Sequence, residues 1–163
     1  MNSIIKIIKD IHIILKKAGN ANAFEFLEWM KKKAEIKYDK PKERNFYILN
    51  NYIYWCELGV NIGSEQDKRR PVIIGRTAKN SPICMIIPLT TARLNDKYDM
   101  HVDLECTNGT AILEQMRVVD KTRIVEPLRK KGKIVQLTEP DVEKINNQIK
   151  RLYFLKPINK IEK

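Results

Sequence analysis

The sequence has no long hydrophobic run, and it contains little histidine or cysteine. No stretch approaches the roughly 18 uncharged apolar residues that a membrane-spanning helix needs, so a transmembrane protein is excluded. The isoleucines near the N-terminus are interrupted by Lys6, Lys9 and Asp10, and no small-residue cleavage site follows them. We therefore expect no signal peptide and a cytoplasmic protein.

The cysteines and histidines do not form a metal-binding pattern. Cys56, Cys84 and Cys106 are odd in number and widely spaced, no CxxC pair is present, and only His12 and His101 could complete a site. We expect buried free thiols in a reducing compartment, with no metal and no other cofactor. The sequence also has no P-loop, GxGxxG, HExxH or GxSxG motif, which excludes the enzyme classes that depend on them.

Charge is abundant, and positive charge is in excess. The chain of 163 residues carries 31 basic and 20 acidic side chains, giving a formal net charge of +11 and a pI near 9.6. Residues 1–46 and 125–163 each carry a net charge of +5, whereas residues 47–124 carry only +1. The excess predicts a polyanionic partner, either nucleic acid or an anionic surface, and it lies on the two flanks of the chain.

Hydrophobic periodicity predicts helices at both ends of the sequence. Apolar residues recur at helical spacing over residues 4–18 and again over residues 23–34, and Pro41 marks a linker after them. Near the other end, Thr138 is followed three residues later by Asp141, which is typical of a helix start. We expect a helix from that point.

Between these helices the pattern changes to short strands separated by turn signals. The expected strands are 52–58, 72–76, 83–88, 100–105, 111–113, 118–119 and 134–137, and residues 59–70 are expected to form a loop. Short strands without intervening helices predict a small antiparallel barrel or sandwich. The expected fold is α+β and mainly β, with a helical extension at 1–46, a barrel domain at 47–157 and a basic tail at 158–163.

Two polar stretches lie at the ends of expected strands. Residues 63–71 form a charged loop that runs straight into a strand, and residues 88–91 place two threonines after an apolar run. Because polar groups at strand ends of a small barrel converge at one rim, we expect these two stretches to meet.

Five short motifs follow one another in a recognisable order. They are Tyr54-Trp55 with Leu58-Gly59, Gly63-Ser64-Glu65-Gln66, Arg70-Pro71-Val72, Pro88-Leu89-Thr90, and the block from Leu113 to Ile124. Together they resemble the MazF/PemK/Kid family of toxin endoribonucleases over about residues 52–154. The last block looks like the family's EQ-x-R-x-x-D-x-x-R signature, whereas the extension at 1–46 is not part of the compact family member.

The resemblance implies a fold, an activity and partners. It implies an SH3-like barrel of the CcdB/Kid type with a C-terminal helix, assembled as a homodimer away from membranes. It implies sequence-specific, metal-independent cleavage of single-stranded RNA, leaving a 2′,3′-cyclic phosphate and a 5′-hydroxyl. An acidic antitoxin encoded nearby would restrain the toxin and bind DNA with it, and the unrestrained toxin would inhibit growth.

The resemblance also implies roles for individual residues. The family's catalytic arginine stands before the proline, which makes it Arg70 and not Arg69. A guanidinium there would stabilise the phosphorane through bidentate contacts. Thr90 matches the family's strand-end hydroxyl and would position the scissile phosphate. The expected substrate-binding residues are Ser64, Gln66, Lys68, Arg69, Thr91, Gln115 and Arg117.

The general base stays open. Ser64 stands where some family members carry a histidine, so the sequence departs from the family there. Glu65 and Glu114 are candidates if a dry site raises their pKa toward neutrality. Water or Arg70 itself are the remaining alternatives.

Ordinary structural roles compete with these assignments. Arg70 could form an ion pair with Glu65, and Glu114 could pair with Arg117 or Arg123. Thr90 could be a turn or cap residue. These alternatives require no catalysis.

Three other side chains also admit two readings. Gln115 could read a base edge or hold a strand end. For Trp55 a core role outweighs base stacking, and His101 lies outside the matched catalytic positions, although a role as a base is conceivable.

Two other functions fit the same fold. One is a protein-binding toxin resembling the CcdB gyrase poisons, and the other is a noncatalytic RNA-binding module. The helical extension could bury its isoleucine stripe against the barrel or a second subunit, bind RNA backbone, or lie on an anionic membrane. The width of the stripe favours burial.

Overall fold

The computed structural model describes residues 3–39 and 43–153, so the expected tail at 158–163 lies outside the described residues. The chain divides into two compact units. One comprises Met1–Glu43 and Leu58–Lys68, and the other comprises Arg44–Glu57 and Arg69–Lys163. Within the described part, no helix is both long and apolar enough to span a bilayer.

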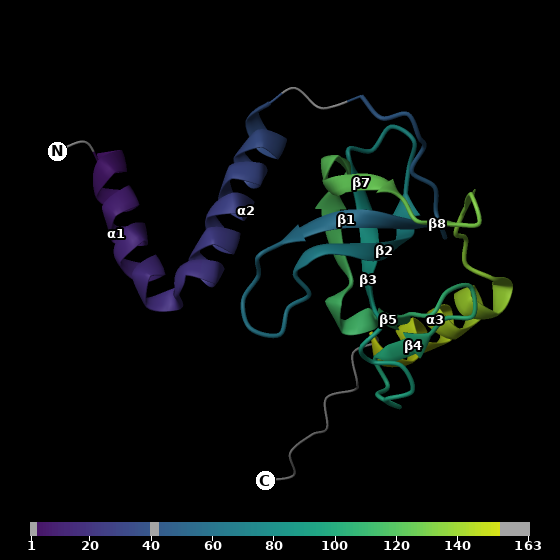
Figure 1. The fold of residues 1–163 in the computed structure, drawn as a ribbon. Coiled ribbons are helices and arrows are strands. Elements are labelled where there is room, and N and C mark those ends of the chain that lie inside the picture. Colours follow the sequence, from purple (N-terminus) through teal and green to yellow (C-terminus); the bar gives the residue numbers. More distant parts are fainter. Residues whose placement is uncertain (1–2, 40–42, 154–163) are drawn as a thin grey trace, which may run out of the picture. The chain divides into compact units, whose positions relative to one another are not determined.

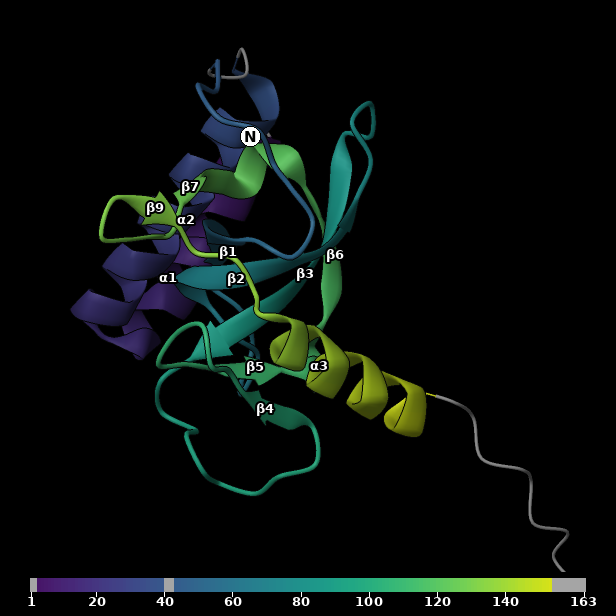
Figure 2. The ribbon, with the colours of Figure 1, turned by 90° about the vertical axis from the view of Figure 1, so that its right-hand side faces the viewer.

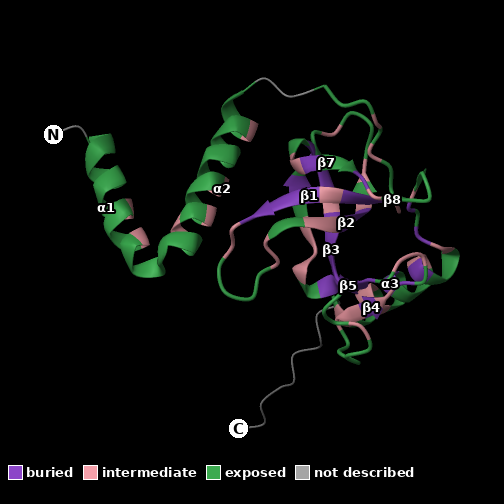
Figure 3. Cartoon of the chain, viewed as in Figure 1, coloured by how far each residue is buried: buried purple, intermediate pink, exposed green. Residues whose placement is uncertain are grey.

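The first unit is built on two helices. The helices α1 (Ser3–Ala18) and α2 (Asn20–Tyr38) confirm the periodicity, and they are separated at Gly19, whose φ is +80°. Neither helix contains a buried residue in the single chain, and most of their surface is exposed (Figure 3). Within this unit the isoleucine stripe is therefore not buried, and its expected burial against the barrel or a second subunit stays a prediction.

The loop Leu58–Lys68 packs against α2 in the same unit. A Cβ atom added to Gly59 would lie 2.6 Å from the indole ring of Trp29, and Gly59 has a φ of +101°. Only glycine satisfies both the contact and the backbone angle. At the other end of the loop, Lys68 Nζ lies 3.0 Å from Glu25 Oε1.

The second unit is built on an antiparallel sheet (Figure 1). Its strands are β1 (Ile53–Gly59), β2 (Lys68–Thr77), β3 (Ile83–Thr90), β4 (His101–Asp103), β5 (Thr110–Ile112), β6 (Arg117–Asp120) and β7 (Ile124–Pro127). The order across the sheet is β4-β5-β3-β2-β1-β7, and β6 pairs with β3. A separate two-stranded ribbon joins β8 (Arg129–Lys130) to β9 (Lys133–Ile134), and α3 (Glu139–Leu152) follows.

These elements confirm most of the expected strands and correct three details. β2 begins at Lys68, so Lys68–Arg70 belongs to a strand and not to the loop expected at 59–70. β7 was not expected, and β9 covers only the beginning of the strand expected at 134–137. Strand pairing extended β2 because backbone hydrogen bonds do not depend on the charge of the side chains.

Helix α3 covers one face of the sheet, as Figure 2 shows for its position beside β5. Ile145 belongs to the buried cluster on that face, and Val142 and Ile149 pack against it. The sheet contributes alternate residues such as Ile73, Ile87 and Leu89 to the cluster. The expected amphipathic C-terminal helix is confirmed, and its apolar stripe closes the core.

The opposite face of the sheet is also buried. Val72, Ile74 and Ile86 each have no exposed surface. Tyr54 lies on this face, where its hydroxyl donates to the carbonyl of Tyr47 at 2.8 Å and accepts from the amide of Leu49 at 3.1 Å. The segment before β1 therefore covers this face, and the strands are apolar on both sides.

A fully buried carboxylate joins α3 to the sheet. Asp141 Oδ1 accepts from the amide of Glu105 at 2.7 Å, and Oδ2 accepts from the amides of Cys106 and Thr138 at 3.2 and 3.1 Å. The Thr138 hydroxyl accepts from the amide of Asp141, which completes the expected capping box. Burial alone would raise the pKa of Asp141, but the hydrogen bonds outweigh it and hold the pKa below its ordinary value.

We predict that Asp141→Asn lowers the free energy of unfolding by about 1.5–3 kcal/mol, because an ionised acceptor of several amide hydrogen bonds is lost. A lowered folded-state pKa gives stability above the unfolded pKa of about 3.9, and that stability is lost as pH falls through the folded pKa. Denaturant unfolding between pH 2 and 7 should therefore show that the free energy of unfolding falls less at acid pH in the variant than in wild type. Glu143→Gln, an exposed change on the same helix, should behave as wild type. If the free energy of unfolding of Asp141→Asn fell at acid pH as much as that of wild type, the role given to the Asp141 carboxylate would be contradicted.

We predict that Gly59→Ala destabilises the first unit by about 1–3 kcal/mol, since the new methyl group meets Trp29 at a positive φ. The matched control is Gly132→Ala, where φ is +78° and nothing lies within 4 Å of the added atom. Both variants carry the backbone strain, so a larger loss of thermal stability in Gly59→Ala isolates the contact with Trp29. Equal losses in the two variants would show that the contact contributes nothing.

Candidate active site

Polar side chains from four strands lie on one face of the sheet. The strand register places Thr90 of β3 opposite Thr110 of β5, and Thr110 opposite Asp103 of β4. On the other side of β3, the pairing with β2 begins at Val72, which lies opposite Pro88. Arg70 precedes Val72 by two residues in β2, so it lies on the same face as Val72. Directly opposed residues of antiparallel strands share a face, so Thr90, Thr110 and Asp103 form a row, and Arg70 lies on the same face of the neighbouring strand.

The two neighbouring arginines of β2 have different surroundings. Arg69 forms an ion pair with Glu126 of β7, and its guanidinium carbon lies 5.6 Å from the centre of the Trp55 ring. Successive side chains of a strand point to opposite faces, so Arg70 points to the face that carries Thr90. Arg70, not Arg69, therefore shares a face with Thr90, as the motif predicts.

The threonines of the row are held in place by hydrogen bonds. Thr90 is 8% exposed, and its hydroxyl accepts from the amide of Ala92 at 3.2 Å. Thr110 is fully buried, and its hydroxyl donates to Asp103 Oδ1 at 2.5 Å, while Asp103 Oδ2 accepts from the amide of Asn95 at 2.9 Å. The sequence motif finds Thr90 but not its neighbours Thr110 and Asp103, because only the strand register reveals them.

Glu114 reaches the same face from the short helix η1 (Leu113–Gln115). His101 of β4 lies opposite Ile112, in the row next to that of Thr110, and its Nε2 lies 3.1 Å from Glu114 Oε1. Glu114 is therefore tied to His101 rather than to Arg117 or Arg123, the two partners considered from the sequence. Gln115 follows it in η1 and is half-buried.

A further basic pair lies near β1. Arg117 begins β6 opposite Ile86, and Arg123 donates from Nη1 to the carbonyl of Glu57 at 3.2 Å.

Burial raises the pKa of the Cys56 thiol to about 12, although the charges of Arg123 and Arg117 act in the opposite direction. Cys56 is therefore a protonated, unreactive thiol, which agrees with the expected structural role.

The remaining cysteines also fit that role in part. Cys84 is buried and free, and burial raises the pKa of its thiol. Cys106 is free but only half-buried, with a pKa raised to about 12 by desolvation and by Asp141. Within residues 3–39 and 43–153, no group of three or more histidine, cysteine or acidic residues is placed to hold a metal ion.

The predicted loop residues belong to the first unit. Ser64 and Glu65 are exposed, Gln66 is half-buried, and Lys68 is paired with Glu25. Thr91, by contrast, follows β3 in the second unit and is exposed. The structure thus brings Arg70, Thr90 and Glu114 to one face, and it places the residues from Ser64 to Lys68 in the other unit.

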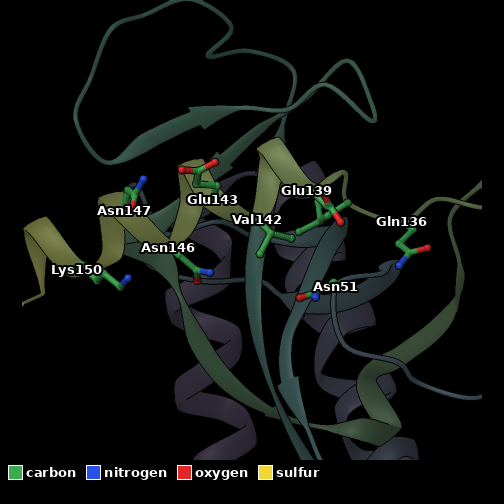
Figure 4. A pocket seen from close by; sticks show the side chains of 9 residues that line it. Asn51, Gln136, Glu139, Val142, Glu143, Asn146, Asn147 and Lys150 are labelled. Carbon is green, nitrogen blue, oxygen red and sulfur yellow. The ribbon is translucent and has the colours of Figure 1, made fainter.

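The sheet also carries a shallow pocket away from this face. It has a volume of about 590 Å³ and runs along α3, and none of the residues expected from the sequence for the site is among the described residues that line it (Figure 4). Its lining consists of Asn51, Gln136, Leu137, Glu139, Val142, Glu143, Asn146, Asn147 and Lys150. This pocket therefore does not coincide with the polar row.

Two related proteins resemble part of this chain, and both are endoribonucleases by name. Endoribonuclease MazF of Staphylococcus saprophyticus is 30% identical over 106 residues, which cover 60% of this chain and 83% of that protein. Endoribonuclease EndoA of Bacillus subtilis is 24% identical over 106 residues, which cover 60% of this chain and 86% of that protein. Both alignments leave a large part of this chain unmatched.

Solved structures show the same fold. The crystal structure of MazF (form I) from Deinococcus radiodurans superposes with a TM-score of 0.55 at 16% identity, covering 67% of this chain and 98% of that one. The structure of MazE–MazF (form II) from the same organism gives a TM-score of 0.51 at 16% identity, covering 66% and 97%. They confirm the expected fold of a mainly β toxin.

The family resemblance read from the five motifs is also confirmed. Residues 51–153 match the family model described as the PemK-like, MazF-like toxin of type II toxin-antitoxin systems. The match covers more than half of the chain and includes every residue of the polar row together with Glu114. This chain therefore belongs to the family of PemK-like, MazF-like toxins of type II toxin-antitoxin systems.

Proposed function

We propose that this chain is a toxin endoribonuclease that cleaves single-stranded RNA at a short sequence without a metal ion. The observation that carries the proposal is the shared face of Arg70, Thr90 and Glu114, in a chain related to two proteins named endoribonucleases. These residue types supply a cation for phosphate, a hydroxyl that positions it and a carboxylate that accepts a proton.

The proposed reaction is an internal transesterification. Glu114 takes the proton of the ribose 2′-hydroxyl, and O2′ then forms a bond to phosphorus while the bond from phosphorus to O5′ breaks. Arg70 stabilises the charge that develops on the nonbridging oxygens, and Thr90 holds the phosphate in line. O5′ takes a proton from solvent, Glu114 later returns its proton to solvent, and the products are a 2′,3′-cyclic phosphate and a 5′-hydroxyl.

Glu114 is the preferred base of the two carboxylates that the sequence offers. It lies on the face of the polar row, whereas Glu65 belongs to the other compact unit. Glu65 joins Ser64, Gln66, Lys68, Thr91, Gln115 and Arg117 as a proposed contact to RNA. Arg69 is proposed as a weaker contact, because Glu126 already partners its guanidinium.

The proposed partners follow from charge and family. The positive flanks would attract RNA, and they would also bind an acidic antitoxin encoded nearby. One related solved structure is a MazE–MazF structure, which supports a toxin–antitoxin pair for this chain. A homodimer and DNA binding together with the antitoxin complete the proposed assembly.

We predict that Arg70→Ala lowers the single-turnover rate of RNA cleavage roughly 100-fold or more, since a positioned donor to the developing charge is lost. Sequencing of the RNA ends identifies the cut sites, and the rate is measured as cleavage at one of these sites. Arg76→Ala, an exposed change in the same strand, should cut as wild type. Equal cleavage by Arg70→Ala and wild type, or none by wild type, would contradict the proposal.

The same assay separates the alternative functions. Growth arrest that survives Arg70→Ala but is lost on deletion of residues 150–163 would indicate a protein-binding toxin. RNA binding that weakens with salt and yields no products would indicate a noncatalytic module.

We predict that EDTA leaves the cleavage rate unchanged, because the proposed chemistry uses only side chains. Products should carry 2′,3′-cyclic phosphates, which block ligation at the 3′ end until acid opens the ring and a phosphatase removes the resulting monophosphate. A rate that falls with EDTA and returns with Mg²⁺ would contradict the metal-free mechanism.

A further inference from the structure

The imidazole of His101 lies between two carboxylates. Its Nδ1 is 2.6 Å from Asp96 Oδ2, its Nε2 is 3.1 Å from Glu114 Oε1, and its side chain is only 9% exposed. Asp96 comes from the loop after β3, His101 from β4 and Glu114 from η1. The three residues therefore form a chain of hydrogen bonds across three elements.

Asp96 is held in its ionised state. Its Oδ1 accepts from the amide of Tyr98 at 3.1 Å. The rings of Tyr98 and His101 pack in a T-shaped arrangement, with their centroids 4.9 Å apart. Slight desolvation would raise the pKa of Asp96, but the hydrogen bonds from Tyr98 and His101 outweigh it and lower the pKa. Because an ionised carboxylate only accepts hydrogen bonds, Nδ1 of His101 must carry a proton.

Nε2 of His101 must also carry a proton, for the same reason. Glu114 must be ionised to act as a base, and an ionised Glu114 accepts but does not donate. His101 satisfies both carboxylates only as an imidazolium with a proton on each nitrogen. A neutral ring that donates to Asp96 would instead turn the lone pair of Nε2 toward Glu114 and repel it.

We propose that His101, oriented by Asp96, is a positioning residue that holds Glu114 ionised and aimed for proton abstraction. The inference rests on the proposed function and adds to it the residue that fixes the base. His101 keeps both of its protons throughout the reaction, so the proton balance of the cleavage step is unchanged. The expected alkaline limit of activity is the loss of one of those protons.

Other charged groups surround this chain of hydrogen bonds. Asp103 lies two residues along β4 on the same face, and Arg93 acts on Asp96 from the same loop. Tyr153, at the end of α3, donates to the carbonyl of Leu113, and its pKa is raised by burial and by Glu114.

The test is the pH profile of the single-turnover rate of RNA cleavage in full-length protein. His101→Ala should lower the rate roughly 10- to 100-fold at neutral pH, since the base loses its alignment. His101→Gln keeps one amide donor near the position of Nε2 and does not titrate, so it should recover part of the rate and lack the alkaline limb. His12→Gln, which changes the other histidine, should keep both the rate and the limb.

The pH profile of Asp96→Asn is a second measurement, and it would stay unchanged if His101 had only a structural role. Loss of the negative charge beside Nδ1 destabilises the imidazolium, so the alkaline limb should move to lower pH. The proposal is overturned if His101→Gln keeps the alkaline limb or is no faster than His101→Ala. An alkaline limb that Asp96→Asn leaves in place would also overturn it.

Failure of the proposed function gives a different result. If Arg70→Ala cleaves RNA as fast as wild type, the active-site assignment fails and the histidine variants carry no meaning for catalysis. If Arg70→Ala is inactive while His101→Ala keeps the wild-type rate and pH profile, only the positioning role fails. Circular dichroism and thermal unfolding of each variant exclude loss of the fold.

Discussion

The pairing of β3 along its two edges is the constraint on which the candidate site depends. On one edge β3 pairs with β2, and on the other it pairs first with β6 and then with β5. The segment that joins β5 to β6 forms η1 between these two pairings, and η1 carries Glu114. A shift of one residue in either register would turn Arg70, Thr90 or Thr110 to the opposite, α3-covered face.

The face that carries the polar row is otherwise lined near β2 and β3 by buried apolar residues such as Val72, Ile74 and Ile86. Buried polar groups are stable only when they are hydrogen-bonded, and Thr110 with Asp103 satisfies this condition inside the sheet. Thr90 and Glu114 lie nearer to solvent and keep the capacity to contact a ligand. The fold therefore fixes the inner part of the row and leaves its outer part available for chemistry.

The sequence predicts some residues of the candidate site but not all of their neighbours. Arg70, Thr90 and Glu114 were predicted because each belongs to a short contiguous motif. Thr110 and Asp103 were missed, since cross-strand pairing is not written in local sequence. His101 stood outside every motif, and its importance depends on a loop residue, Asp96, that only the tertiary structure brings to it.

The same distinction applies to the fold. The helices α1, α2 and α3 follow from periodicity and, for α3, from the Thr138–Asp141 capping box. The length of β2 and the existence of β7 depend on hydrogen bonds to neighbouring strands, so charged Lys68 and the short segment Ile124–Pro127 gave no clear signal. The isoleucine stripe of α1 predicted burial, yet the single chain leaves it exposed.

The central claim is that RNA meets the face shared by Arg70, Thr90 and Glu114. Its most direct test is an NMR titration with an RNA oligonucleotide that spans the mapped cut site and carries 2′-deoxyribose at the cut nucleotide, so that it binds without cleavage. We expect the largest amide shifts at Thr90, Thr91 and Glu114. Shifts confined to the pocket along α3, at Asn51, Asn146 and Asn147, would contradict it.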